Sequence, residues 1–171
     1  MNMLLIATCV TAWLSLIFGI IGLFGIWIEI DYQSVYYSYS ESSGIISYEK
    51  GSVTITSILA GIAVGCAFFA AIASSVAFCV HDARTFLLTT ATFSFLASVF
   101  SVAAFADYCY HLDEYMDHIS AIGGSASYSY GFGFEIAAFI LALICLGSSI
   151  FAYKRSSSTP STNITMVDSK V

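Results

Sequence analysis

Three of the residues between Asp107 and Gly123 whose side chains can bind metal ions are spaced to share one helical face. His111, Glu114 and His118 lie at positions i, i+3 and i+7, so a helix would place all three on one face. Imidazole nitrogens and carboxylate oxygens are ligands for zinc. The same composition is typical of a solvated, acidic helix end, and we favour that interpretation over a metal site.

The last three residues could bind a partner. Ser169, Lys170 and Val171 give a hydroxyl two positions before an apolar residue with a free carboxylate. A PDZ groove accepts such an end by adding it as a strand to its sheet. Residues 154–171 are rich in Ser and Thr and show no apolar period, so we predict a disordered tail. The hypothesis is a PDZ-type scaffold as the partner of this tail.

Chemistry of other kinds has no support in the sequence. We find no nucleophile–base set and no glycine loop that would hold a phosphate. We therefore expect neither an enzyme nor a bound cofactor, and the acidic chain, with a net charge of −6, is not expected to bind nucleic acid.

The composition indicates the kind of fold that holds these residues in place. Charged residues make up 9% of the chain and hydrophobic residues 58%, whereas a soluble domain has about 25% charged residues. Four segments reach the roughly 20 apolar residues that cross a bilayer. They are residues 3–28, 53–80, 86–106 and 132–153. We predict an all-α membrane protein over residues 1–153, a left-handed four-helix bundle with a small extracellular β-sheet.

The charges indicate the orientation of this bundle. Four of the five basic residues lie in the short turn after the second segment, in the tail or at its end: Arg84, Lys154, Arg155 and Lys170. Lys and Arg are enriched on the cytoplasmic side. We therefore expect a multi-pass protein of the plasma membrane with both termini in the cytoplasm and both longer connections outside.

Glycines at regular spacing indicate close helix packing. The first segment carries Gly19, Gly22 and Gly25, and the second carries Gly61 and Gly65. Such stripes let two membrane helices approach closely. We expect the contact at the second pair to lie within the chain, with a second copy or another membrane protein as the alternative.

The first outer connection is dense in tyrosine. Residues 35–39 and 45–48 are β-prone and are separated by Glu41-Ser42-Ser43-Gly44, which predicts a hairpin. Residues 126–130 are the predicted third strand, because an isolated hairpin is marginal in water. The tyrosines that could form contacts outside the cell are Tyr36, Tyr37, Tyr39 and Tyr48. The third apolar helix is expected to continue beyond the membrane as far as Gly123-Gly124.

Glu135 is an acid near the outer end of the fourth segment. It either reaches water at the membrane interface or is a functional residue, because acids inside a membrane are costly. Both interpretations stay open.

The pattern resembles the claudin superfamily, which includes peripheral myelin and epithelial membrane proteins and regulatory γ subunits of channels. The resemblance rests on the four spans, the extended third helix, and the run that opens the fourth segment: Tyr130, Gly131, Phe132, Gly133 and Phe134. The first connection departs from the family, because it lacks the Trp-x-Gly-Leu-Trp motif and the two disulfide-bonded cysteines. The four-span MARVEL family is the alternative.

The resemblance implies a structural role at cell–cell contacts, such as adhesion or junction organisation, with the tail bound to a scaffold. Two other functions remain open. The first alternative is an auxiliary subunit of a channel or receptor. The second is a MARVEL-like tetraspan that acts in vesicle traffic. Its expected partners are the lipid bilayer, a PDZ scaffold, and either further copies of itself or a larger membrane protein.

Overall fold

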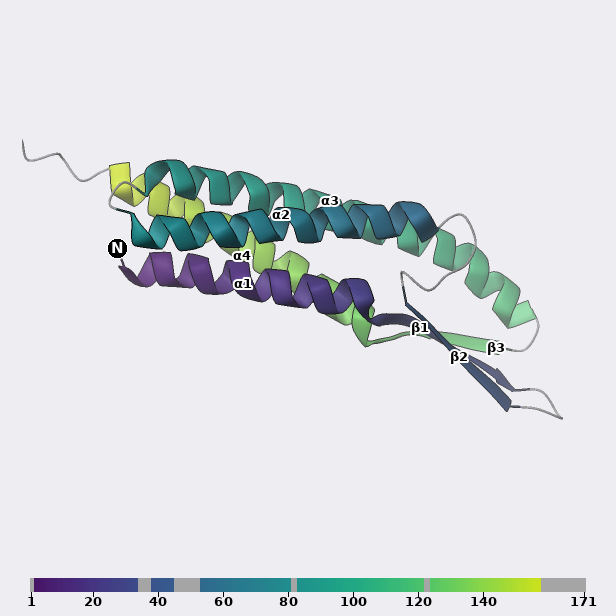
Figure 1. Cartoon of the computed structure of the whole chain (residues 1–171). Helices are drawn as coiled ribbons and strands as arrows, with labels where there is room; N and C mark the ends of the chain where they lie inside the picture. Colours follow the sequence, from purple (N-terminus) through teal and green to yellow (C-terminus); the bar gives the residue numbers. More distant parts are fainter. Residues whose placement is uncertain (1, 34–37, 45–52, 81–82, 122–123, 158–171) are drawn as a thin grey trace, which may run out of the picture.

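The computed structural model describes residues 2–33, 38–44, 53–80, 83–121 and 124–157 (Figure 1). Its elements in chain order are α1 (Asn2–Phe24), β1 (Ile26–Gln33), β2 (Ser38–Gly44), α2 (Val53–Cys79), α3 (Arg84–Ala121), β3 (Gly124–Tyr128) and α4 (Tyr130–Ser157). The helices form one elongated bundle, and the strands lie together at one of its ends (Figure 1). We call that end the sheet end, and the opposite end, where α1 begins, the tail end.

Each helix of the bundle contains a segment long and apolar enough to cross a membrane. These segments are Met3–Phe24, Ile55–Cys79, Arg84–Tyr110 and Tyr130–Ser156. The prediction of four membrane spans is therefore confirmed, and the chain is a multi-pass membrane protein by the length and composition of its helices.

The distribution of side chains is the reverse of that in a soluble bundle. Among the described apolar residues that are buried, only Leu5, Leu16, Leu87 and Cys145 are larger than alanine. Large apolar side chains such as Ile17, Phe69 and Ile140 are exposed on the outer surface. A bundle in water would expose this surface at great cost, whereas lipid tails solvate it. Small interior residues let membrane helices approach closely.

The helices pack in a square. α1 contacts α2 and α4, and α3 contacts the same two neighbours. The middle of the interior is an alanine cluster around Ala12, Ala71 and Ala97. Leu87 and Ala152 belong to a second cluster at the tail end. The third cluster, at the sheet end, brings Phe132 against Ala60 and Ala104.

Only part of the predicted glycine packing is found. A Cβ on Gly19 would lie 3.2 Å from Val64 Cγ2, and one on Gly25 would lie 2.8 Å from Gly131 Cα. Gly22 is equally tight, against α4. A Cβ on Gly61 or Gly65, in contrast, would meet no atom within 4 Å. The close contact expected for that pair inside the chain is therefore absent, since α2 turns these glycines away from its neighbours.

The sheet is three-stranded and antiparallel, with the order β2-β1-β3. The predicted third strand, residues 126–130, overlaps β3, and the predicted strand at residues 45–48 lies outside the described residues. Two other boundaries differ from the prediction: β1 begins at Ile26, inside the predicted first span of residues 3–28, and Glu41–Gly44, predicted as the turn, belong to β2. Gly25 ends the helix and Ile28-Glu29-Ile30-Asp31 then alternates with period two, which is the pattern of a strand. The high hydropathy of Ile26–Ile28 concealed that change.

The third helix extends well beyond the membrane segment, as its pattern predicts. α3 has 38 residues, which corresponds to roughly 57 Å at 1.5 Å per residue. A hydrocarbon core is about 30 Å thick. The part of α3 after Tyr110 therefore projects past the bundle beside the sheet (Figure 1).

Candidate functional site

The most unusual polar side chain of the bundle is Glu135. It lies in the second turn of α4, near the sheet end, and is only 1% exposed. It faces the interior of the bundle. Of the two interpretations from the sequence, the one in which Glu135 reaches water at the membrane interface is therefore wrong. A buried acid inside a membrane helix is a candidate functional residue.

The carboxyl group of Glu135 has one satisfied and one unsatisfied oxygen. The Ser101 hydroxyl on α3 donates a hydrogen bond to Oε1 over 3.1 Å. Oε2 is buried and has no hydrogen-bond partner. Buried polar atoms without a partner are rare in folded proteins, so this oxygen distinguishes Glu135 from the other polar side chains of the interior.

Gly22 on α1 makes room for this carboxyl group. A Cβ at Gly22 would lie 2.7 Å from Oε2 and 3.0 Å from the backbone nitrogen of Glu135. Any residue with a side chain would therefore push α1 away from α4. The sequence identified Gly22 as part of a packing stripe, but it did not reveal that the stripe accommodates an acid.

A small cavity adjoins Glu135. Its lining includes Ser15 and Gly19 from α1, Val64 and Ala67 from α2, and Ser101 from α3. About 10 Å³ is open to the centre of a water molecule, which is close to the minimum that one water requires. The Ser15 hydroxyl, which also lines the cavity, donates to the carbonyl oxygen of Ala138 over 2.9 Å.

No described basic residue of the four helices lines the cavity beside Glu135. The four helices carry basic residues only at the tail end and in the projecting part of α3: Arg84, Lys154, Arg155, His111 and His118. Arg84 instead donates from Nη2 to the carbonyl oxygen of Ser156 over 2.7 Å. The described helices therefore place an acid in the apolar interior without a counter-charge.

Hydroxyl groups line the rest of the interior, and most of them bond within the bundle. Thr8 donates to Ser148 over 3.0 Å, joining α1 to α4. Thr56 donates to Asp107, joining α2 to α3 near the sheet end. These bonds satisfy polar groups that water cannot reach, and each stabilises a helix pair by about 1 kcal/mol.

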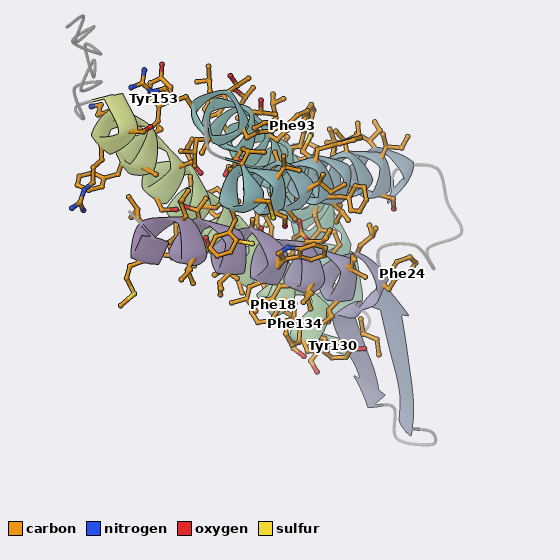
Figure 2. The ribbon with its side chains drawn as sticks, turned by 60° about the vertical axis from the view of Figure 1, so that its left-hand side comes forward. Phe18, Phe24, Phe93, Tyr130, Phe134 and Tyr153 are labelled. Carbon is orange, nitrogen blue, oxygen red and sulfur yellow. The ribbon has the colours of Figure 1, made fainter. Side chains whose placement is uncertain are left out.

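The aromatic run at the start of α4 joins the sheet to the helices. The Phe132 ring stacks on Tyr128 of β3 with centroids 4.5 Å apart, and it meets Phe105 of α3 at 5.3 Å. Phe134 packs edge-on against Phe18 of α1 at 5.4 Å. Figure 2 shows Phe18 and Phe134 close together, with Tyr130 beyond them toward the strands. Gly131 is the point at which Gly25 of α1 approaches α4.

The remaining predicted site residues are only partly described. His111, Glu114 and His118 lie on the projecting part of α3, and their side chains are outside the described part of the chain. Across the residues whose side chains are described, no group of three His, Cys, Asp or Glu is placed to hold a metal ion. Tyr39 lies in β2, where it pairs with Tyr32. The other predicted contact residues lie outside the described residues: Tyr36, Tyr37, Tyr48, Ser169, Lys170 and Val171.

The comparisons with known proteins give no relative. No protein-family model matches this chain, and no curated protein matches its sequence. Any function therefore has to be inferred from the chain itself.

Proposed function

We propose that this chain is a claudin-like tetraspan membrane protein with a structural role at cell–cell contacts. In this proposal the helices form a left-handed bundle in the plasma membrane, and the sheet end lies outside the cell. Both termini lie in the cytoplasm, where Ser169, Lys170 and Val171 bind a PDZ scaffold. The charge pattern supports this orientation, because Arg84, Lys154 and Arg155 lie at the tail end.

The observation that carries the proposal is the way the sheet is mounted. β1 follows α1 after a single residue, Gly25, and β3 precedes α4 after a single residue, Ser129. Stacking of Phe132 on Tyr128 fixes this junction further. The sheet is therefore held rigidly on the helix ends, and a rigid surface loses little entropy on binding.

The composition of the sheet and its connections suits contact with another protein. Tyr32 and Tyr39 are paired across β1 and β2, and further tyrosines lie in the adjoining segments of the chain. Tyrosine gives a large contact area at low entropic cost. β2 is also an edge strand, and of the residues that commonly block edge pairing it contains one charge, Glu41, and neither lysine nor proline.

The test is a mixed culture of cells that lack native junctions, in which expressing and non-expressing cells share borders. Tagged protein should be enriched at borders between two expressing cells, relative to mixed and free borders. Replacing Tyr36, Tyr37 and Tyr48 by serine should remove this enrichment at equal surface expression, whereas Tyr153→Ser at the tail end should not. Uniform surface signal for the unmodified protein would contradict a role in adhesion. A purely vesicular signal would favour a function in vesicle traffic.

The scaffold part of the proposal has a separate test. Deleting Ser169, Lys170 and Val171 should reduce retention at expressing–expressing borders, because the terminal carboxylate that a PDZ groove binds is lost. Unchanged retention after the deletion would refute scaffold binding and leave adhesion through the sheet end intact.

One observation favours the auxiliary-subunit function as the second candidate. Gly61 and Gly65 lie one turn apart on α2 with no atom of this chain near their Cβ positions. Exposed Ile58 and Ile62 flank them. Such a surface accepts a helix of a larger membrane protein. Stoichiometric co-purification with such a protein, lost in a Gly61→Leu variant, would support this function.

A further inference from the structure

We propose that Glu135 is a proton-binding site in the interior of the bundle. It holds a proton as a neutral carboxylic acid while α1 and α4 are packed together. The proposed function makes no use of this residue, and the inference does not depend on it.

The geometry requires that the charge of Glu135 be neutralised. The side chain is 1% exposed, Oε2 has no hydrogen-bond partner, and the Ser101 hydroxyl at Oε1 is the only described donor to a negative charge there. An unpaired ion in such surroundings costs several kcal/mol even after relaxation. Protein side chains cannot remove this cost, because the residues that line the cavity are small, apolar or hydroxyl-bearing.

Among the described residues, those that line the cavity with Glu135 carry no titratable or charged group. α1 contributes Ser15, Gly19 and Gly22. The cavity residues of α2 are Ala63, Val64 and Ala67, those of α3 are Ala97 and Ser101, and those of α4 itself are Ala138 and Ala142. The other titratable groups on the membrane segments do not line the cavity: Cys9, Cys66, Cys79, Arg84, Asp107, Tyr108, Cys109, Tyr110, Tyr130, Cys145, Tyr153, Lys154 and Arg155. None of the described residues that line the cavity therefore supplies the neutralising charge.

The size of the cavity favours a proton over a metal cation. A calcium ion takes six to eight oxygen ligands, and magnesium demands an octahedral shell. The oxygen-bearing side chains of the cavity are those of Glu135, Ser15 and Ser101, and about 10 Å³ is open to the centre of one water. Such a space cannot hold a cation together with the waters that would complete its shell. A proton needs no ligand shell.

The proton would bind to Oε2. Oε1 already accepts the Ser101 hydroxyl hydrogen, so it remains the carbonyl oxygen of the acid. The lone pair of Oε2 takes the proton, and the buried carboxyl group becomes neutral. Gly22 covers Oε2 from α1. Release of the proton leaves a buried charge, and it therefore requires α1 and α4 to separate.

Infrared spectroscopy of the purified full chain tests the assignment. A protonated carboxylic acid has a C=O stretching band well separated from the carboxylate bands. The sample is kept at neutral pH in a maltoside detergent, because lipid ester carbonyls absorb in the same region. We expect the acid band in the unmodified protein and its loss in Glu135→Gln. The control Glu114→Gln, in the projecting part of α3, should keep the band.

A second variant tests the hydrogen bond to the acid. Ser101→Ala removes the donor to Oε1, and a carbonyl that loses a hydrogen bond absorbs at higher frequency. The band should therefore move upward without losing intensity. A merely structural role of Ser101 would not move it.

Two outcomes would overturn the proposal. Identical spectra of the unmodified protein and Glu135→Gln in the acid region would mean that Glu135 is ionised in the folded bundle. An acid band that appears only after sodium in the buffer is replaced by choline would assign the cavity to a metal cation. Glu135→Gln keeps the size of the side chain, and its circular dichroism shows independently that the variant is folded.

Discussion

Replacing Gly22 by alanine tests the contact between α1 and α4 that encloses Glu135. The new Cβ would lie 2.7 Å from Oε2, 3.0 Å from the backbone nitrogen and 3.1 Å from the Cβ of Glu135. Carbon atoms in contact are normally about 3.5–4.0 Å apart. Two of the three atoms belong to or lie next to the backbone of α4, so a change of rotamer cannot relieve the clash. The helices have to separate locally by roughly 0.5 Å.

The cost can be isolated with a matched control. Overpacking of a well-packed interior costs about 1–3 kcal/mol. Alanine also favours the helix by about 0.8–1.0 kcal/mol relative to glycine. Gly61→Ala gains the same helix contribution, but its Cβ meets no atom within 4 Å. The difference in the free energy of unfolding between the two variants should therefore be about 1–3 kcal/mol, with Gly22→Ala the less stable.

The assay is SDS-induced unfolding in mixed micelles, followed by the fluorescence of Trp13 and Trp27. Trp13 lies on α1 and its Nε1 donates to Ser75 Oγ of α2 over 3.1 Å, so its emission reports separation of these helices. Equal unfolding free energies for Gly22→Ala and Gly61→Ala would refute the close contact of α1 with α4.

Two further substitutions have matched controls. Leu87 is 2% exposed and Leu88 is 55% exposed. Leu87→Ala should therefore lower the free energy of unfolding by about 2–5 kcal/mol through the cavity it leaves, and Leu88→Ala should lower it much less. Equal losses of unfolding free energy in SDS would show that α3 is rotated. Thr56→Val removes the hydroxyl donor to Asp107 and should cost about 1–3 kcal/mol, because a hydrogen bond to a charged group contributes more than one between neutral groups. Thr92 bonds only to the carbonyl of its own helix and is exposed, so Thr92→Val should be close to neutral, and similar values for the two threonines would argue against the link between α2 and α3.

The spans could be predicted because they depend on a property that is summed along the chain. About 20 apolar residues without charge determine a membrane helix regardless of its neighbours. The extension of α3 also follows from local pattern, since no glycine or proline interrupts residues 84–121. Such features can be predicted without knowing which segments of the chain pack against them.

The boundary between α1 and β1 could not be predicted by the same reasoning. Ile26-Trp27-Ile28 is as hydrophobic as the helix before it, and hydropathy does not distinguish a helix from a strand in a short apolar run. The partner strands decide the outcome, because Ile28 pairs with Ser43 on one side and Tyr128 on the other. Tyr128 is 100 residues away in the sequence, and a local pattern does not contain that information.

The candidate site could be predicted only in part, for a related reason. The sequence identified Gly22 and Glu135 separately, each as one feature of its own helix. Whether Glu135 faces the lipid, the water or the interior depends on the rotation of α4 against α1 and α3. Ser101 gave no signal, because a single serine in a membrane helix is common. Likewise, the spacing of Gly61 and Gly65 equals that of a packed glycine pair, but spacing does not specify whether a neighbour is present.

The unbroken length of α3 makes it a lever. It runs from the tail end, where Arg84 is bonded to Ser156 of α4, to a free arm beside the sheet, where it contacts β3. A continuous helix is stiff, so a sideways load on the arm is not absorbed at a hinge. It is passed along α3 to the helices α2 and α4, against which α3 packs from the sheet end to the tail end.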